Sequence, residues 1–474
     1  MRRSILLALP LVALSLALPL RAAAAKPVTS PKRTLPDYGA LPKRESGRAA
    51  LVVPRLVLLP PYLVWNYGIR TPLGALVSHA ERNQWPTKVL DFFTFGPDRT
   101  AGIVPTALFD FGIKPSVGVF AFWNKLLHPD NSATFHFGTW GPRWMNITGS
   151  DRVRIGTESF AVLSGRFTLR PDMPFYGLGP RSLLKERVRY NSNLREIGLG
   201  TDMTPTSNHE NALKNEGADA PPARVLRVLT RVGVRALTFG EGRGNPDPEF
   251  DPSDPKDNDN LEMKRAIALG RIEEPPGFAR GYTALFQRVD VQLDTRPRRP
   301  ASQSGFKIVA EAEHGSDVRN AGGAAWMRWG GTAGAFLDVG KNRTFGVTFT
   351  GLFADPIQGE VPFTELVNFG GATYMRGFLW NRLIGRSGAI GTLEYHWPIW
   401  VFLDGTIQAS MGNVFDAHLK GFAPRLLRMS SAIGVRTSNT PNQAFEAMFG
   451  IGSETIADGF AINSFRLVIG TNQF

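Results

Sequence analysis

From about residue 100 onwards, apolar and polar residues alternate over many short segments of the chain. In one segment Leu285, Val291 and Leu293 alternate with Asp290 and Asp294. A period of two gives a β-strand one apolar and one polar face. The pattern predicts strands at residues 100–112, 115–126, 131–140, 150–157, 159–170, 187–200, 224–238, 281–294, 303–314, 325–339, 342–354, 388–400, 403–413, 427–437, 442–452 and 463–474.

Two architectures share this alternation, because a soluble sandwich buries the apolar face and a membrane barrel turns it toward lipid. The segments run for roughly 10–13 residues, which is long for soluble strands and suits tilted membrane strands. Charged residues on the polar face, such as Arg288 and Asp290, fit a water-filled lumen. We therefore predict an all-β fold, a transmembrane antiparallel β-barrel of about 16 strands over residues 99–474.

The N-terminal residues have the order of a secretory signal peptide. Arg2 and Arg3 precede an apolar run over 5–20, and Ala23 to Ala25 form a small-residue cleavage site. A membrane anchor is the alternative, which prolines within the apolar run disfavour. We expect a signal peptide at 1–25, cleaved near Ala25, and a mature protein in the outer membrane of a Gram-negative type of cell.

Residues 26–98 differ from the rest in composition. The stretch 26–50 is rich in proline and basic residues and predicts a flexible tether. Further on, Thr71 can cap a short amphipathic helix that runs to Ala80. This helix either packs on the folded domain or binds a membrane surface. We predict that 26–98 form a tether and a short periplasmic helical extension.

Charge and motifs exclude several function classes. The net charge is +13, and an exported basic chain meets anionic outer-membrane lipids, whereas no dense basic run supports nucleic-acid binding. The chain has no cysteine, no G-x-S-x-G motif, and no zinc motif after His209 and Glu210. The acidic stretch 251–262 either holds calcium or is a solvated loop. We expect no enzyme, no catalytic residue, no metal site and no cofactor.

Three segments in the last third of the chain, 370–378, 391–399 and 408–416, carry a resemblance to a known family. Together they resemble the bacterial surface-antigen superfamily of outer-membrane assembly barrels, the group of BamA/TamA and the two-partner-secretion transporters. The chain also ends in Phe474, as many outer-membrane barrel strands do.

The resemblance implies a lumen site. Arg376, Gly377 and Phe378 match the tip of a long loop that folds back into the barrel, where a buried cation needs carboxylate partners. By alternation, Glu394 and Ser410 point into the lumen. The family carries aspartate where this chain has Ser410. Arg376 therefore relies on Glu394 alone or is also neutralised by Asp404; the alternative is a solvated loop arginine.

Members of this superfamily that handle clients carry periplasmic polypeptide-transport-associated domains, and residues 26–98 do not show their pattern. The chain is identified as a barrel-only member. The resemblance implies a role in inserting or translocating polypeptide or lipid at the outer membrane, at a weak seam between the first and last strands. Clients would be unfolded outer-membrane or secreted proteins. The alternative is a passive pore or a structural barrel plugged by the loop.

Overall fold

A computed structural model describes residues 91–96, 99–156, 159–206, 225–242, 261–296, 304–320, 323–340, 342–399, 403–437 and 445–471, together with six single positions between 59 and 88. Among these residues, no helix has the length and apolar character needed to cross a membrane. The predicted signal peptide, Phe474 and most of the acidic stretch 251–262 lie outside the described residues, and so does the helix predicted from Thr71, except for Thr71 and His79.

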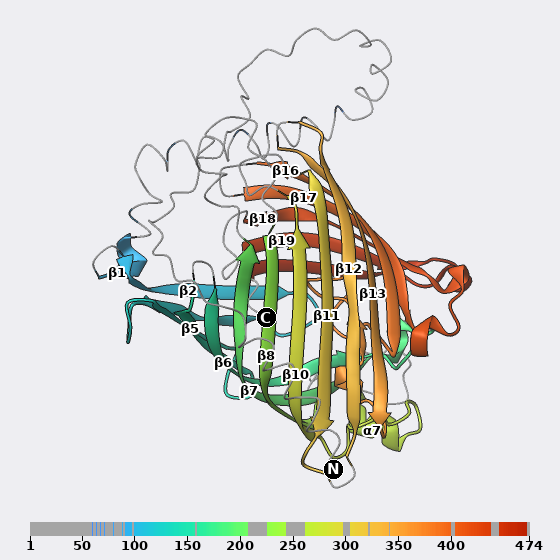
Figure 1. The fold of residues 1–474 in the computed structure, drawn as a ribbon. Helices are drawn as coiled ribbons and strands as arrows, with labels where there is room; N and C mark the ends of the chain where they lie inside the picture. The colour runs from blue at the N-terminus through green and yellow to red at the C-terminus, as the bar shows by residue number, and fades with distance from the viewer. Residues whose placement is uncertain are drawn as a thin grey trace.

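Sixteen long antiparallel strands form one closed barrel in the described part of the chain (Figure 1). They are β2 (Ala101–Asp110), β3 (Ser116–Asn124), β4 (Asn131–Thr139), β5 (Met145–Arg154), β6 (Phe160–Phe175), β7 (Val188–Thr206), β8 (Val225–Glu241), β10 (Tyr282–Asp294), β11 (Gly305–Asp317), β12 (Ala325–Asp338), β13 (Thr344–Gln358), β16 (Ser387–Pro398), β17 (Leu403–Phe415), β18 (Arg428–Thr437), β19 (Phe445–Ser453) and β20 (Ile462–Thr471). Each predicted strand corresponds to one of them, which confirms the predicted fold class.

The apolar face of the barrel points outward. Large side chains such as Val117, Ile197, Phe349 and Leu393 are exposed on the outside, while the residues next to them in sequence face inward. A soluble sandwich would bury these side chains. Their exposure excludes the sandwich and leaves the membrane-type barrel.

The predicted strand bounds differ from the structure at β5, β7 and β8. β5 begins at Met145, five residues before the predicted start, because pairing with β4 continues where alternation is weak. β7 and β8 run past their predicted ends at residues 200 and 238, into the polar segments 201–222 and 239–280. The second segment also contains the short strand β9 (Leu261–Glu262) and the helix α7 (Met263–Ala268). Since consecutive strands run antiparallel, these two connections lie at opposite ends of the barrel.

The short strand β1 (Thr94–Phe95) pairs with the start of β2 at Ala101 and Gly102. The sheet therefore begins a few residues before the predicted boundary at residue 99.

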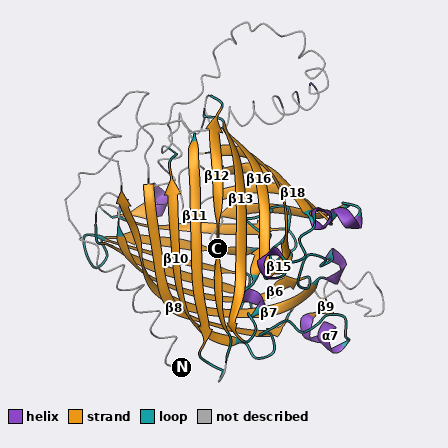
Figure 2. Cartoon of the chain, turned by 45° about the vertical axis from the view of Figure 1, so that its right-hand side comes forward, coloured by secondary structure: helices purple, strands orange, loops and turns teal. Residues whose placement is uncertain are grey.

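One end of the barrel, which we call the capped end, carries the described residues of the connections at 176–187, 261–281, 359–386, 416–427 and 454–461. Figure 2 shows α7 and β15 (Leu383–Gly385) at this end. The other short elements there are η4 (Leu184–Glu186), η6 (Phe363–Glu365), β14 (Val367–Phe369), η7 (Ala417–Leu419), η8 (Pro424–Leu426) and η9 (Ile456–Asp458).

The hydrophobic core lies inside the barrel. Phe363, Phe369 and Phe378 of the connection 359–386, which we call the lumen loop, pack with Tyr190 and Trp326 from the barrel wall. Burial of this apolar surface holds the loop within the lumen. The lumen loop therefore fills the barrel toward its capped end.

Candidate functional site

The barrel closes at a short seam between its first and last long strands, β2 and β20. Among the described residues, three pairs join them, Leu108 with Gly470, Phe109 with Ile469, and Asp110 with Val468. Every other pair of neighbouring long strands shares at least seven pairs among the described residues. Within the described part of the chain, the seam is therefore the shortest ladder between long strands.

The hydrogen-bond phase of β2 shows which backbone groups face the seam. The N–H of Asn124 in β3 donates to the carbonyl of Thr100, and the N–H of Phe111 donates to the carbonyl of Leu467 in β20. In an antiparallel ladder these directions alternate, so the odd-numbered residues of β2 face the seam. One of them is Pro105, which has no N–H. Among the described residues, 103–107 have no strand partner on this side.

A buried ion pair reinforces the seam on its lumen side. Arg466 of β20 donates to Asp110 of β2 through two bonds, Nε to Oδ1 at 2.9 Å and Nη2 to Oδ2 at 2.7 Å. Both side chains are 3% exposed. The remaining guanidinium nitrogen, Nη1, donates to the carbonyls of Gly371 at 2.7 Å and Arg376 at 3.4 Å in the lumen loop. Arg466 thus contacts both sides of the seam and the loop.

The tip of the lumen loop, residues 370–378, docks on the three last strands by close backbone contact. The N–H of Gly377 donates to Ser430 Oγ of β18 at 2.7 Å, and Ser464 Oγ of β20 donates to the Gly377 carbonyl at 3.3 Å. A Cβ at Gly377 would lie 1.9 Å from the carbonyl oxygen of Ile451, and one at Gly450 would lie 2.8 Å from Gly377 Cα. Only glycine permits this approach.

The structure gives Arg376 a different partner from the predicted one. Its Nη1 lies 3.3 Å from Glu446 Oε2 of β19 and 2.8 Å from Met448 Sδ. Glu394 faces the lumen but pairs with His396 at 3.2 Å, so the expected ion pair with Arg376 is absent.

The other predicted partners do not contact Arg376 either. Ser410 faces the lumen and its Oγ lies 2.9 Å from Thr392 Oγ1. Asp404 is buried on β17, opposite Arg436 in the ladder with β18. The side chain of Arg376 is 16% exposed, and its carboxylate partner comes from β19 and not from β16 or β17.

A double-mutant cycle tests this assignment. We expect Arg376→Ala and Glu446→Gln each to destabilise the docked tip, and the double variant to lose little more than either single variant, since each loss leaves the other charge unpaired. Limited proteolysis of the lumen loop measures the loss. Glu394→Gln is the matched control and should be additive with Arg376→Ala. A non-additive result for Glu394 and an additive one for Glu446 would contradict the assignment.

A second charge cluster holds the lumen loop to the capped end. Arg382 of the loop and Arg428 of β18 are both fully buried and share one carboxylate, Glu454. Arg382 Nη2 lies 3.1 Å from both Glu454 oxygens, and both arginines donate to the carbonyl of Ser182. Two buried cations therefore depend on a single acid.

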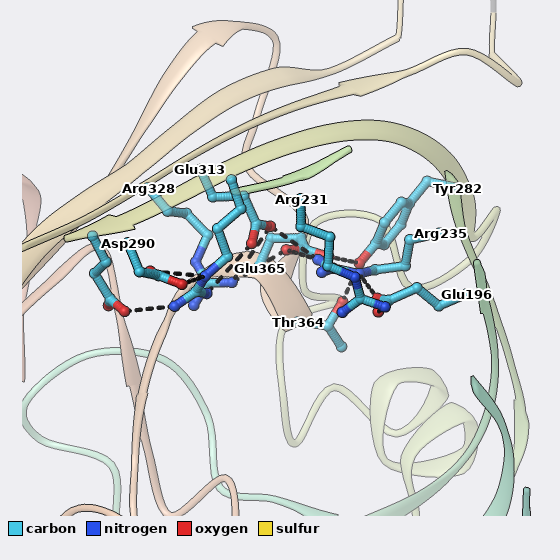
Figure 3. Close-up of polar contacts among 11 residues, drawn as sticks. Glu196, Arg231, Arg235, Tyr282, Asp290, Glu313, Arg328, Thr364 and Glu365 are labelled. Atoms are coloured by element: carbon cyan, nitrogen blue, oxygen red, sulfur yellow. Dashed lines mark hydrogen bonds and ion pairs between the residues drawn. The ribbon is translucent and has the colours of Figure 1, made fainter. Parts of the chain in front are cut away.

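A third cluster, the wall cluster, lies on the inner face of β7, β8, β10, β11 and β12 (Figure 3). At its centre Glu365 of the lumen loop accepts from Arg235 Nη1 at 2.9 and 3.0 Å and from Tyr282 OH at 2.6 Å. Arg235 also bonds Glu196 and Glu313. The cluster is completed by Arg231, Arg288, Asp290, Glu311 and Arg328. The lumen loop is thus tied to opposite parts of the wall.

The site consists of ion pairs and hydrogen bonds within the protein. Among the residues the structure describes, no group of three or more metal-ligating side chains comes together. The polar groups form ion pairs and backbone bonds that hold a seam and a loop in place. Sequence analysis missed Asp110, Arg466, Glu446 and Glu454; the only available signal was that charged residues occupy lumen-facing positions between outward apolar residues.

Comparisons with known proteins support the fold. The chain is similar to BamA from Haemophilus ducreyi lacking POTRA domains 1–3, with a TM-score of 0.50 and 11% identity over 78% of this chain and 70% of that chain. It is less similar to CdiB from Acinetobacter baumannii (TM-score 0.45, 10% identity, 78% of this chain) and CdiB from Escherichia coli (0.46, 12%, 79%). The match spans 60% and 64% of those two chains, less than two thirds of each.

No protein-family model matches the chain, and no curated protein matches it. The likeness to BamA supports the barrel fold that the sequence predicts.

Proposed function

We propose that this barrel resides in the outer membrane of a Gram-negative type of cell and aids insertion or translocation of polypeptide or lipid there by opening between β2 and β20. The observation that carries the proposal is the seam, which has three residue pairs among the described residues, whereas every other ladder between long strands has at least seven. The likeness of the fold to BamA supports the same class of function.

The backbone ladder of the seam can separate at moderate cost, to which the buried Arg466–Asp110 ion pair adds. A backbone hydrogen bond contributes about 0.5–1.5 kcal/mol net, so three residue pairs contribute only a few kcal/mol. The other fifteen ladders of the barrel stay intact when this one separates. Separation would expose backbone donors and acceptors that can pair with an extended segment, and it would give the lumen a lateral exit.

A second candidate function, a structural barrel plugged by its loop, is favoured by two observations. The lumen loop is bound at its tip, at the capped end and at the wall cluster. Pro105 removes one donor from the middle of the seam-facing edge of β2, a device that protects sheet edges from pairing with other strands. A barrel of this kind would keep its seam closed.

An engineered disulfide across the seam distinguishes the two candidate functions experimentally. The chain has no cysteine, so Phe109→Cys with Ile469→Cys introduces a single pair at directly opposite, outward positions. Opposite Cα atoms in such ladders are about 4.5–5.5 Å apart, within disulfide range. Phe449→Cys with Leu467→Cys, opposite each other in β19 and β20, is the matched control.

The variants are expressed in a deletion strain of the organism that makes the protein, and the outer-membrane and secreted proteomes and the lipid composition are quantified. We expect the seam lock to reproduce the deletion and to be rescued by reductant, while the control lock behaves as wild type. Full activity of the locked seam would refute opening and favour the structural barrel.

Pro105 itself gives a further prediction. Pro105→Val restores the missing N–H on the exposed seam edge, and we expect more edge-to-edge association, seen as a several-fold larger dimer fraction in detergent by light scattering. Ala107→Val adds the same kind of apolar side chain at a seam-facing position that already has its N–H, and should stay monomeric. Equal dimer fractions in the two variants would show that Pro105 does not protect the edge.

A further inference from the structure

We propose that Arg466 couples two movements in this barrel, the separation of the seam and the release of the loop tip, so that they occur as one event. The inference rests on the proposed function, because it concerns the same seam. The coupling itself is a property of the barrel and can be measured without any client.

The guanidinium of Arg466 is divided between two partners that would move apart. Nε and Nη2 hold Asp110 on β2, and Nη1 holds the carbonyls of Gly371 and Arg376 at the loop tip. A planar guanidinium makes all these bonds in one orientation. If β2 withdraws, the bonds that fix this orientation are lost, and the contact with the tip weakens.

Charge balance acts in the same direction. Two arginines, Arg376 and Arg466, lie close enough to repel each other, and two carboxylates neutralise them, Glu446 and Asp110. Glu446 belongs to β19 and stays with the wall, whereas Asp110 belongs to β2 and leaves when the seam opens. Arg436 and Glu394, which also act on Arg376, are opposite in sign, so the loss of Asp110 leaves a buried positive charge without its acid. Release of Arg376 relieves this unfavourable state.

A packing contact adds to the coupling. Leu379, which follows the loop tip, lies against Gly112, which follows β2, so closely that a Cβ at Gly112 would lie 2.7 Å from the Leu379 side chain. The tip itself docks on β18, β19 and β20. Withdrawal of β2 thus removes one side of the tip's surroundings and leaves the other in place.

Hydrogen exchange of the full-length protein in lipid nanodiscs tests the coupling through the rate at residues 370–380. Asp110→Asn removes the charge while keeping the side-chain shape, and we expect exchange there to accelerate about tenfold, within the usual range of coupling between sites. The seam lock between positions 109 and 469 should slow the same exchange on oxidation. The lock between 449 and 467 should change nothing.

Two results would overturn the inference. One is an unchanged exchange rate at residues 370–380 when the seam lock is oxidised. The seam lock alters neither Arg466 nor Asp110, so this measurement stays informative even if the Asp110→Asn variant folds poorly. The other is equal acceleration by Asp110→Asn in 370–380 and in the distant strands β10 to β13, which a purely structural ion pair would give.

The two proposals can fail separately. Coupled exchange with no effect of the seam lock on the proteome or lipids would leave the coupling intact in a structural barrel. A proteome effect without coupled exchange would leave the proposed function standing and remove Arg466 from its mechanism.

Discussion

Glu454→Gln should destabilise the barrel more than any other single loss of charge described above, by about 3–5 kcal/mol. Arg382 and Arg428 are buried at the capped end, and Glu454 is their shared carboxylate. Its removal leaves two desolvated cations supported only by neutral acceptors such as the carbonyl of Ser182. The measurement is the midpoint of urea unfolding in detergent, followed by heat-modifiable electrophoretic mobility.

Two further variants make this prediction specific. Glu360→Gln removes an exposed acid from the same lumen loop and should leave the midpoint within experimental error. Arg428→Met in the Glu454→Gln background should recover part of the loss, because one of the two unpaired cations is gone. A Glu454→Gln midpoint close to that of Glu360→Gln would show that the shared carboxylate contributes little.

Glu365→Gln should release the other side of the lumen loop, at a cost of about 3 kcal/mol in local stability. Glu365 is the residue through which the wall cluster reaches the loop, accepting from Arg235 and from Tyr282. A glutamine can replace only part of this bonding, and Arg235 would repel the new amide group. We expect faster protease cleavage within 360–369 and a larger single-channel conductance in planar bilayers.

Asp290→Asn is the matched control for Glu365→Gln. Asp290 belongs to the same wall cluster and pairs with Arg288, but neither residue contacts the lumen loop in the described structure. Both variants remove one negative charge from the lumen. If conductance changed only because of the lost charge, the change would be the same in both variants. Equal conductance would contradict a tether at Glu365.

The strands were predictable because alternation is a local property. Most of the sixteen segments carry their own apolar face, and the outward position of residues such as Val117 and Phe349 follows from a period of two. The prediction was least accurate at β5, where glycine and polar residues replace the alternation, and at the ends of β7 and β8. There, pairing with a neighbouring strand extends the ladder beyond what the residues themselves indicate.

The partners within the lumen were not predictable in the same way. Glu394 and Glu446 both face inward, and alternation alone cannot decide which of them Arg376 contacts, because that depends on where the loop tip docks. The docking position depends on glycines such as Gly450, whose role appears only when two backbones meet. Asp110 and Arg466 lie near opposite ends of the chain, and only closure of the barrel makes them neighbours.

The short seam also determines the order in which the barrel can assemble. It joins Leu108 to Gly470, whereas the other described ladders between long strands join strands that follow one another along the chain. Contacts between positions far apart in the chain form late, because bringing them together costs chain entropy that the new contacts must offset. The three described residue pairs of the seam offset little of this cost. The species before closure is a curved open sheet with two free edges, which is prone to pairing with other chains. During its own biogenesis this barrel therefore needs the same protection of strand edges that we propose it offers to others.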